Sequence, residues 1–286
     1  MFKLIFTNAK GESIELYGPP YRLMRVEGLG DVEADVQTQK APFQDGETLI
    51  DTVFDARYIQ IEIKIVGEDE ADIEAKRRYL AAVFNPRLGE GTLFYESETT
   101  TRQINAVADS IPLFPDGSTN RGRTFQKAVI NLVCPNPYWQ GILEGDQMAY
   151  LMGGLKFPLV LPARFAHRGF QRVFTNAGDV PTPVQIEFKG PAQNPTIYNR
   201  TTGEFIKVNR DLGENDILYV DTSFGNKTVE ILRAESNEKE NAFNYIDLDS
   251  TFFQLEVGDN LIEYNSNNDS ILTRVRISYR NRYVAI

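Results

Sequence analysis

The sequence has few of the residues that carry chemistry, because its 286 residues include one cysteine, one histidine and one tryptophan. Cys134 cannot form a disulfide within the chain, so packing and hydrogen bonds must hold the fold together. We expect Cys134 to be a small buried side chain on a strand. His167 has no second histidine or reactive cysteine with which to form a metal site or a catalytic triad.

Recognisable catalytic motifs are missing as well. The chain contains no G-x-S-x-G elbow, no P-loop, no dinucleotide-binding fingerprint and no H-E-x-x-H motif. We therefore predict a protein that is not an enzyme, with no cofactor and no bound metal.

Positive charge and long apolar runs are also scarce. Thirty Lys and Arg face 40 Asp and Glu, which gives a formal net charge of −10. This balance argues against specific nucleic-acid binding, because affinity for DNA depends on basic side chains that neutralise phosphates. No run approaches the ~18 apolar residues of a membrane span, and the apolar start Met1–Phe6 is too short for a signal peptide.

The apolar content and the length of the chain suffice for two folded domains. Apolar residues make up 42% of the chain and aromatic residues 11%, as in ordinary globular proteins. The length exceeds the usual size of one domain. A boundary is predicted at Cys134-Pro-Asn-Pro-Tyr-Trp139, because prolines lack the amide that a sheet ladder needs. The predicted parts are a domain over 1–139, an irregular linker over 140–172 and a domain over 173–286.

The first domain is predicted to be mainly β, a sandwich or split barrel with one helix. Its clearest strand is Tyr58–Val66, where isoleucines alternate with polar residues. The helix is predicted over about 69–84, since acidic residues crowd its start and Asn85-Pro86 ends it. Further strands are expected at Phe2–Thr7, Ser13–Tyr17, Tyr21–Leu29, Gly91–Glu96, Arg102–Asp109 and Thr124–Cys134.

Two long polar stretches interrupt these strands. Residues 37–47 carry Pro42 and Phe43, and residues 110–123 carry Leu113, Phe114, Arg121 and Arg123. Connections of this length usually bind a partner or are flexible, and the sequence leaves both readings open. These six side chains are the candidate subunit or partner contacts.

The second domain reads as about eight short strands separated by Gly, Asn and Asp turns, which indicates a jelly-roll sandwich. Three features admit two readings. Asp247 and Asp249 could be a glycosidase pair or a solvated strand face. Asp259-Asn260 and Asn267-Asn268-Asp269 could bind calcium or form hairpin turns. Aromatic residues could stack on sugars but are more often core: Tyr198, Tyr219, Phe224, Tyr245 and Phe252.

The order of these features resembles that in the distal tail proteins of siphophages. These are long-tailed phages, and the resemblance is to those that infect Gram-positive bacteria. The resemblance rests on the helix ending in Asn85-Pro86 and on the strand that enters Cys134–Trp139. It continues through Asn176-Ala-Gly-Asp179, Asn194-Pro-Thr-Ile197 and Gly258-Asp-Asn260. It spans nearly the whole chain, although each motif is short.

The resemblance implies a structural subunit of the virion at the tail tip, made in the host cytoplasm. It further implies a homohexameric ring of first domains, and a second domain with a galectin-like or carbohydrate-binding-module-like jelly roll. The implied partners are the tail tube protein and the tail-associated hub protein, with a channel for DNA. The alternative is a module that recognises a cell-wall saccharide.

Overall fold

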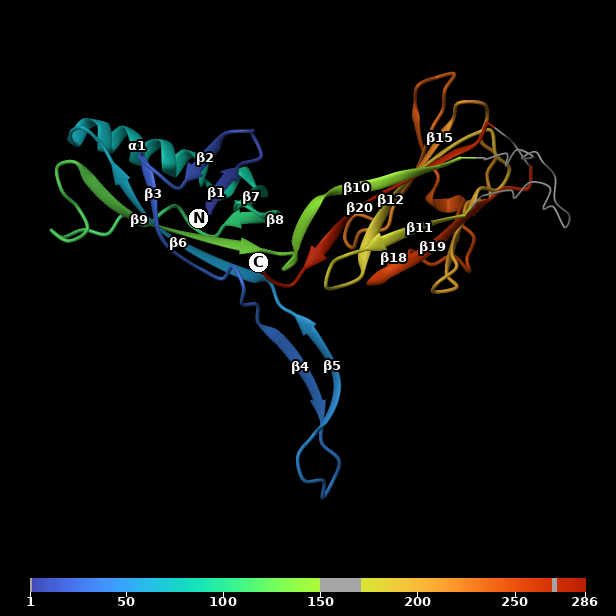
Figure 1. Ribbon diagram of the computed structural model, residues 1–286, viewed down its shortest axis with the longest axis horizontal. Coiled ribbons are helices and arrows are strands. Elements are labelled where there is room, and N and C mark those ends of the chain that lie inside the picture. The colour runs from blue at the N-terminus through green and yellow to red at the C-terminus, as the bar shows by residue number, and fades with distance from the viewer. Residues whose placement is uncertain (1, 150–170, 269–271) are drawn as a thin grey trace, which may run out of the picture. The chain divides into compact units, whose positions relative to one another are not determined.

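The computed structural model describes residues 2–149, 171–268 and 272–286 (Figure 1). The chain forms two compact units, Met1–Gly141 together with Tyr283–Ile286, and Ile142–Arg282. The last residues of the chain therefore belong to the first unit. His167 and Asp269 lie outside the described residues.

The first unit is a split barrel. Its strands run in the order β2 (Ser13–Leu16), β1 (Lys3–Thr7), β7 (Gly91–Glu96), β8 (Thr101–Ala108), β9 (Phe125–Cys134), β6 (Arg57–Val66) and β3 (Tyr21–Glu27). The barrel stays open between β2 and β3, which in the described part of the chain meet at one bridge, Tyr17 with Arg22. The mainly β prediction is confirmed.

The core of this unit follows from the alternation in β6. Ile59, Ile61, Ile63 and Ile65 are each at most 1% exposed and point into the barrel. Burying one such side chain contributes about 1.5–3 kcal/mol, so this strand alone is a large part of the apolar stabilisation.

The predicted helix is confirmed as α1 (Glu70–Val83). Asp69 caps its start by accepting the backbone N–H of Asp72 at 2.8 Å. At its end the buried Phe84 stacks on Phe6 with ring centroids 4.5 Å apart, which fixes the helix on the barrel. A short 3-10 turn, η1 (Pro86–Leu88), follows.

The polar stretch 37–47 is the connection of an antiparallel hairpin. Its first three residues end β4 (Ala34–Gln39), and residues 40–47 lead into β5 (Thr48–Phe54), so the sequence missed the two strands on either side of the connection. Figure 1 shows this hairpin projecting away from the rest of the first unit. We call residues 34–54 the hairpin arm.

The second unit is a two-sheet sandwich, as the sequence predicts. One sheet has the order β17 (Lys239–Asn241), β16 (Thr228–Leu232), β15 (Ile217–Asp221), β12 (Thr182–Lys189), β20 (Arg274–Tyr283) and β10 (Trp139–Ala149). The other has the order β11 (Gln171–Asn176), β19 (Gly258–Asn265), β13 (Thr196–Asn199) and β14 (Phe205–Lys207). The short β18 (Gln254–Leu255) pairs with β12, and η2 (Phe243–Tyr245) is a single 3-10 turn.

Two details of the predicted second half differ from the structure. The stretch 140–172, expected to be irregular, is strand at both ends, in β10 and in β11, and residues 150–170 lie outside the described part. Asp247 and Asp249 lie in a turn, so they do not share a strand face.

Candidate assembly and binding surfaces

The hairpin arm has no core of its own. Every residue of β4 and β5 is exposed, although Val36, Leu49, Val53 and Phe54 are apolar. Isolated two-stranded hairpins are marginal in water, because they bury too little apolar surface. An arm of this kind is suited to be completed by contact with another surface.

The strand register makes the arm two-faced. Directly opposed residues share a face, and the pairs Ala34 with Phe54, Val36 with Thr52 and Thr38 with Leu49 lie on one side. The opposite side carries Asp35 with Val53 and Gln37 with Asp51. A bulge between the pairs of Gln37 and Thr38 brings Leu49 onto the apolar face.

The arm is also acidic. Six carboxylates flank or line it, namely Glu33, Asp35, Asp45, Glu47, Asp51 and Asp55, against the single cation Lys40. Its complementary surface should therefore be apolar with basic groups at its margin.

A buried arginine holds the base of the arm. Arg57 is 1% exposed and donates to the carbonyl oxygens of Gly28 at 3.0 Å, Leu29 at 3.2 Å, Asp31 at 2.8 Å and Pro137 at 2.8 Å. Its Nη2 donates to the carbonyl oxygen of Val284. Burial lowers the pKa of Arg57 from its ordinary value.

Trp139 reinforces this junction. The ring is fully buried, and its Nε1–H donates to the Leu29 carbonyl at 2.9 Å. Arg57 and Trp139 thus tie the segment before the arm to residues of the predicted boundary motif and to the chain's last residues. The sequence signals Trp139 as a boundary, but no pattern in it singles out Arg57.

The six predicted contact residues fall into two groups. Pro42 and Phe43 lie at the arm's tip, where Phe43 has a φ of 66° and is fully exposed. Leu113, Phe114, Arg121 and Arg123 belong to the stretch between β8 and β9. They remain candidate contacts.

The stretch between β8 and β9 is more ordered than its composition indicates. Leu113 exchanges backbone hydrogen bonds with Val129 and keeps its side chain 62% exposed. Phe114, by contrast, packs on the core beneath the guanidinium of Arg77, which is 4.6 Å from the ring centroid. Arg121 pairs with Glu70 at 2.9 Å, and Arg123 lines a shallow groove beside it.

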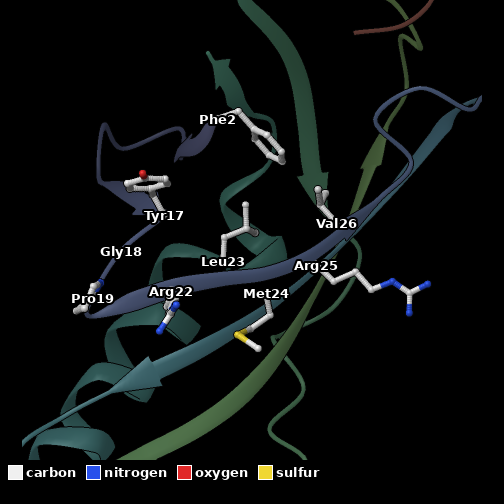
Figure 2. Close-up of a pocket in the computed structure, with 9 residues that line it drawn as sticks. All are labelled: Phe2, Tyr17, Gly18, Pro19, Arg22, Leu23, Met24, Arg25 and Val26. Atoms are coloured by element: carbon white, nitrogen blue, oxygen red, sulfur yellow. The ribbon is translucent and has the colours of Figure 1, made fainter. Parts of the chain in front are cut away.

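The opening between β2 and β3 forms a groove of about 480 Å³. Figure 2 shows Leu23 and Val26 rising from one side of β3 toward Phe2, while Arg22 and Met24 leave the opposite side. Phe2, Leu23 and Val26 are half-buried and continuous with the barrel core. The groove is therefore an apolar gap in the barrel with two arginines, Arg22 and Arg25, on its rim.

Of the five predicted aromatic residues of the second unit, Phe224 is exposed and the other four are half-buried, and Tyr245 and Phe252 pack against the core. Phe224 is 79% exposed, and Lys227 Nζ lies 5.0 Å from its ring and 5.3 Å from that of Phe252. Phe252 stacks on the half-exposed Phe243 at 5.7 Å. Tyr198, Tyr219 and Tyr245 are half-buried, each beside a basic side chain.

The acidic candidates have structural partners. The side-chain bond from Lys207 at 3.1 Å is the main cause that lowers the pKa of Asp247. Asp259 accepts from Thr175 at 2.7 Å, and the buried Asn260 bonds Glu256 within a turn. Across the described residues no three His, Cys, Asp or Glu side chains gather as metal ligands. In the same residues, no helix has the length and apolarity to cross a membrane.

Known proteins match this architecture. A family model of the siphovirus-type tail component C-terminal domain matches residues 177–283, and one of the phage tail protein RIFT-related domain matches residues 10–134. The chain belongs to the distal tail protein family of siphophages. Among curated proteins none matches the chain.

Solved structures share the fold across the whole length. The Dit protein of phage SPP1, described as a hub of the adsorption apparatus, superposes with a TM-score of 0.70 at 13% identity over 99% of each chain. A chain of the phage P2 baseplate in its activated conformation with calcium has a TM-score of 0.60 at 10% identity over 100% of each chain. The family is one of structural tail proteins, which confirms the non-enzymatic prediction and a place in the virion's distal tail.

Proposed function

We propose that this chain forms a closed homohexameric ring through its first unit, which joins the tail tube protein to the tail-associated hub protein and leaves a channel for DNA. The observation that carries the proposal is the hairpin arm, a fully exposed structure with one apolar face. A ring requires heterologous contacts, in which two different patches of each copy meet. The arm supplies one patch.

The net charge supports a role beside DNA. A chain with a charge of −10 repels a polyanion, so a channel built from such copies passes DNA without retaining it. Affinity for the phosphate backbone would oppose transit.

Native mass spectrometry and electron microscopy of the purified chain test the ring. We expect six-fold rings or stacks of them at micromolar concentration. A particle that stays monomeric at high concentration would overturn the proposal.

The second candidate function is recognition of a cell-wall saccharide by the second unit. It is favoured by one observation, the surface cluster of Phe224 and Phe243, which are exposed, with Lys227 and the half-buried Phe252, because aromatic faces stack on sugar rings. The full chain and its Phe224→Ser variant should differ on an array of cell-wall glycans. Equal binding, or none by either chain, would remove this candidate.

A further inference from the structure

We infer that a polar hollow at the surface of the second unit binds one sugar unit of a neutral oligosaccharide. The hollow has a volume of about 480 Å³ and is lined by Asn194, Asn209, Arg210, Asp211 and Arg233. This volume lies within the range of about 300–1,000 Å³ that is usual for small-molecule sites. The inference rests on the second candidate function, recognition of a saccharide by the second unit, and is independent of the ring.

The fold holds the lining residues in place. Three of them form the short segment 209–211, which lies between two buried residues, Val208 and Leu212. Val208 forms a β-bridge with Ile246, and Leu212 exchanges backbone hydrogen bonds with Ala192 at 2.8 and 3.1 Å. Both ends of the segment are therefore fixed, which reduces the entropy lost when a ligand binds.

Arg233 is also held in one position. Its Nη1 donates to the Asp216 carboxylate at 2.8 Å and to the Asp211 carbonyl oxygen at 3.2 Å. Its Nε donates to the Glu240 carboxylate at 2.9 Å. The guanidinium therefore presents its remaining N–H to the hollow in a preset direction.

The charges around the hollow are balanced. Glu240 pairs with both arginines of the lining, at 3.4 Å from Arg210 and 2.8 Å from Arg233. Asp211 places a further carboxylate on the lining. A ligand anion would lie beside Asp211 and a ligand cation beside the arginines, so either would meet a group of its own sign. The hollow therefore favours a neutral ligand.

The polar groups left open in the hollow include both donors and acceptors. Neither the side-chain amide of Asn194 nor the carboxylate of Asp211 makes a hydrogen bond to a described residue. An amide both donates and accepts, whereas a carboxylate only accepts. Sugar hydroxyls do both and can therefore pair with each group, whereas an apolar ligand would leave the two groups unpaired.

A short turn joins the hollow to the surface cluster of phenylalanines. The turn η2 contains Phe243, which stacks on Phe252, and Tyr245, whose ring centroid lies 4.8 Å from the guanidinium of Arg210. The Tyr245 carbonyl oxygen also accepts the backbone N–H of Asn209 at 2.7 Å. Cα atoms two residues apart lie within about 7.6 Å of one another, so one oligosaccharide can place a unit in the hollow and the next unit on the rings.

The chain offers a matched pair of asparagines for the test. Asn194 and Asn237 both have left-handed backbones, with φ of 49° and 54°, and of the two only Asn194 lines the hollow. Glycine adopts this conformation readily, so replacement by glycine should preserve both turns. A loss of binding confined to Asn194→Gly therefore reports the amide and not the backbone.

Isothermal titration calorimetry of the full chain with neutral tetrasaccharides of glucose, galactose, rhamnose and N-acetylglucosamine tests the inference. We expect the parent chain to bind at least one of them. Asn194→Gly should bind that sugar about three- to tenfold more weakly, because it loses one or two hydrogen bonds between neutral groups, and Asn237→Gly should bind it like the parent. Equal affinities of the two variants, or no binding by the parent chain, would overturn the inference.

A second pair of variants removes a carboxylate. Asp211→Ala should weaken binding about tenfold or more, because hydrogen bonds to a charged group are stronger, whereas Asp249→Ala, in an exposed turn, should leave it unchanged. Both side chains are exposed, so the thermal unfolding midpoint should not fall in either variant. Unweakened binding by Asp211→Ala would remove its carboxylate from the site and contradict the assignment.

Sodium phosphate is the anionic probe. At constant ionic strength it should not displace the bound sugar, and the affinity for the sugar should be nearly the same at low and high salt, because a neutral ligand is not screened. Displacement by phosphate, or a steep loss of affinity with salt, would show that charge selects the ligand and would overturn the inference.

Phe224→Ser in the same titrations separates this inference from the second candidate function. Weaker binding by Phe224→Ser with full binding by Asn194→Gly keeps saccharide recognition and rejects the hollow. The reverse result keeps the hollow and rejects the phenylalanine cluster. Absence of binding by the parent chain rejects both.

Discussion

At the scale of single residues, the least replaceable polar group of the first unit is Arg57. Its N–H groups donate to carbonyl oxygens in three separate segments of the chain. A side chain without N–H groups at this position leaves these buried acceptors unpaired. We expect Arg57→Met to lower the free energy of unfolding of the first unit by about 3 kcal/mol. Trp139, the chain's one tryptophan, lies beside this site and reports the transition by fluorescence in urea.

The exposed Arg78→Met serves as the control for Arg57→Met and should change the unfolding midpoint little. Equal stability of Arg57→Met and the parent chain would mean that the five carbonyl contacts carry no net stabilisation. The same Arg57 variant should also loosen the base of the arm, which faster amide exchange in β4 and β5 would reveal.

Asp216 is the corresponding group of the second unit. Burial opposes its ionisation, but the N–H groups of Ala234 and Gly213 and the guanidinium of Arg233 outweigh it and lower the pKa of Asp216 below 3.8. A lowered folded-state pKa stabilises the unit above pH 3.8, and this contribution disappears as pH falls through the folded value.

We therefore expect Asp216→Asn to destabilise the second unit at neutral pH by about 1–2 kcal/mol, and we expect this deficit to shrink as the pH falls below 3.8. Urea unfolding followed by circular dichroism at neutral pH and over a series of acidic pH values measures this. The exposed Asp249→Asn provides the baseline. A deficit that persists unchanged at low pH would exclude the ionised carboxylate as its cause.

At the scale of elements, the sequence predicts those strands and helices that bury one face in a core. The alternating isoleucines of β6 and the capped, amphipathic α1 can be recognised in the sequence, because one face of each packs against the core. The strands of the arm carry no such pattern, since every residue in them is exposed, and the sequence therefore predicts a polar connection over 37–47 and no strand on either side of it. In the proposed ring the packing partner of the arm lies on another copy, which accounts for both its exposure and its weak sequence pattern.

The stretch between β8 and β9 contains an exposed side chain, Leu113, and a packed one, Phe114, and substitutions at these two positions should have different effects. Leu113→Asp changes a 62% exposed position and should weaken assembly with unfolding unaffected, if this stretch contacts another subunit. Phe114→Ala removes a ring packed between the core and Arg77 and should destabilise the first unit by about 2 kcal/mol. Analytical ultracentrifugation and thermal unfolding of both variants separate the two effects, and intact assembly by Leu113→Asp would remove it as a contact.

At the scale of the whole molecule, two electrostatic effects compete in a ring of these copies. Each copy carries −10, so the copies repel one another over long distances, whereas opposite charges that meet at a contact between copies attract one another. Salt shortens the screening length from about 30 Å at 0.01 M to about 8 Å at 0.15 M, which removes the long-range repulsion first. Raising the salt across this interval should therefore strengthen ring formation, as measured by the concentration at which half of the chain is assembled.

The variant Arg22→Gln tests this balance. It removes one cation, which changes the net charge of each copy from −10 to −11 and so increases the repulsion between copies. It should therefore assemble more weakly than the parent chain at low salt and approach the parent as salt is added. If the parent ring instead weakens steadily as salt rises from the lowest concentration, attraction between opposite charges at the subunit contacts outweighs the repulsion, and the ring is held mainly by ion pairs.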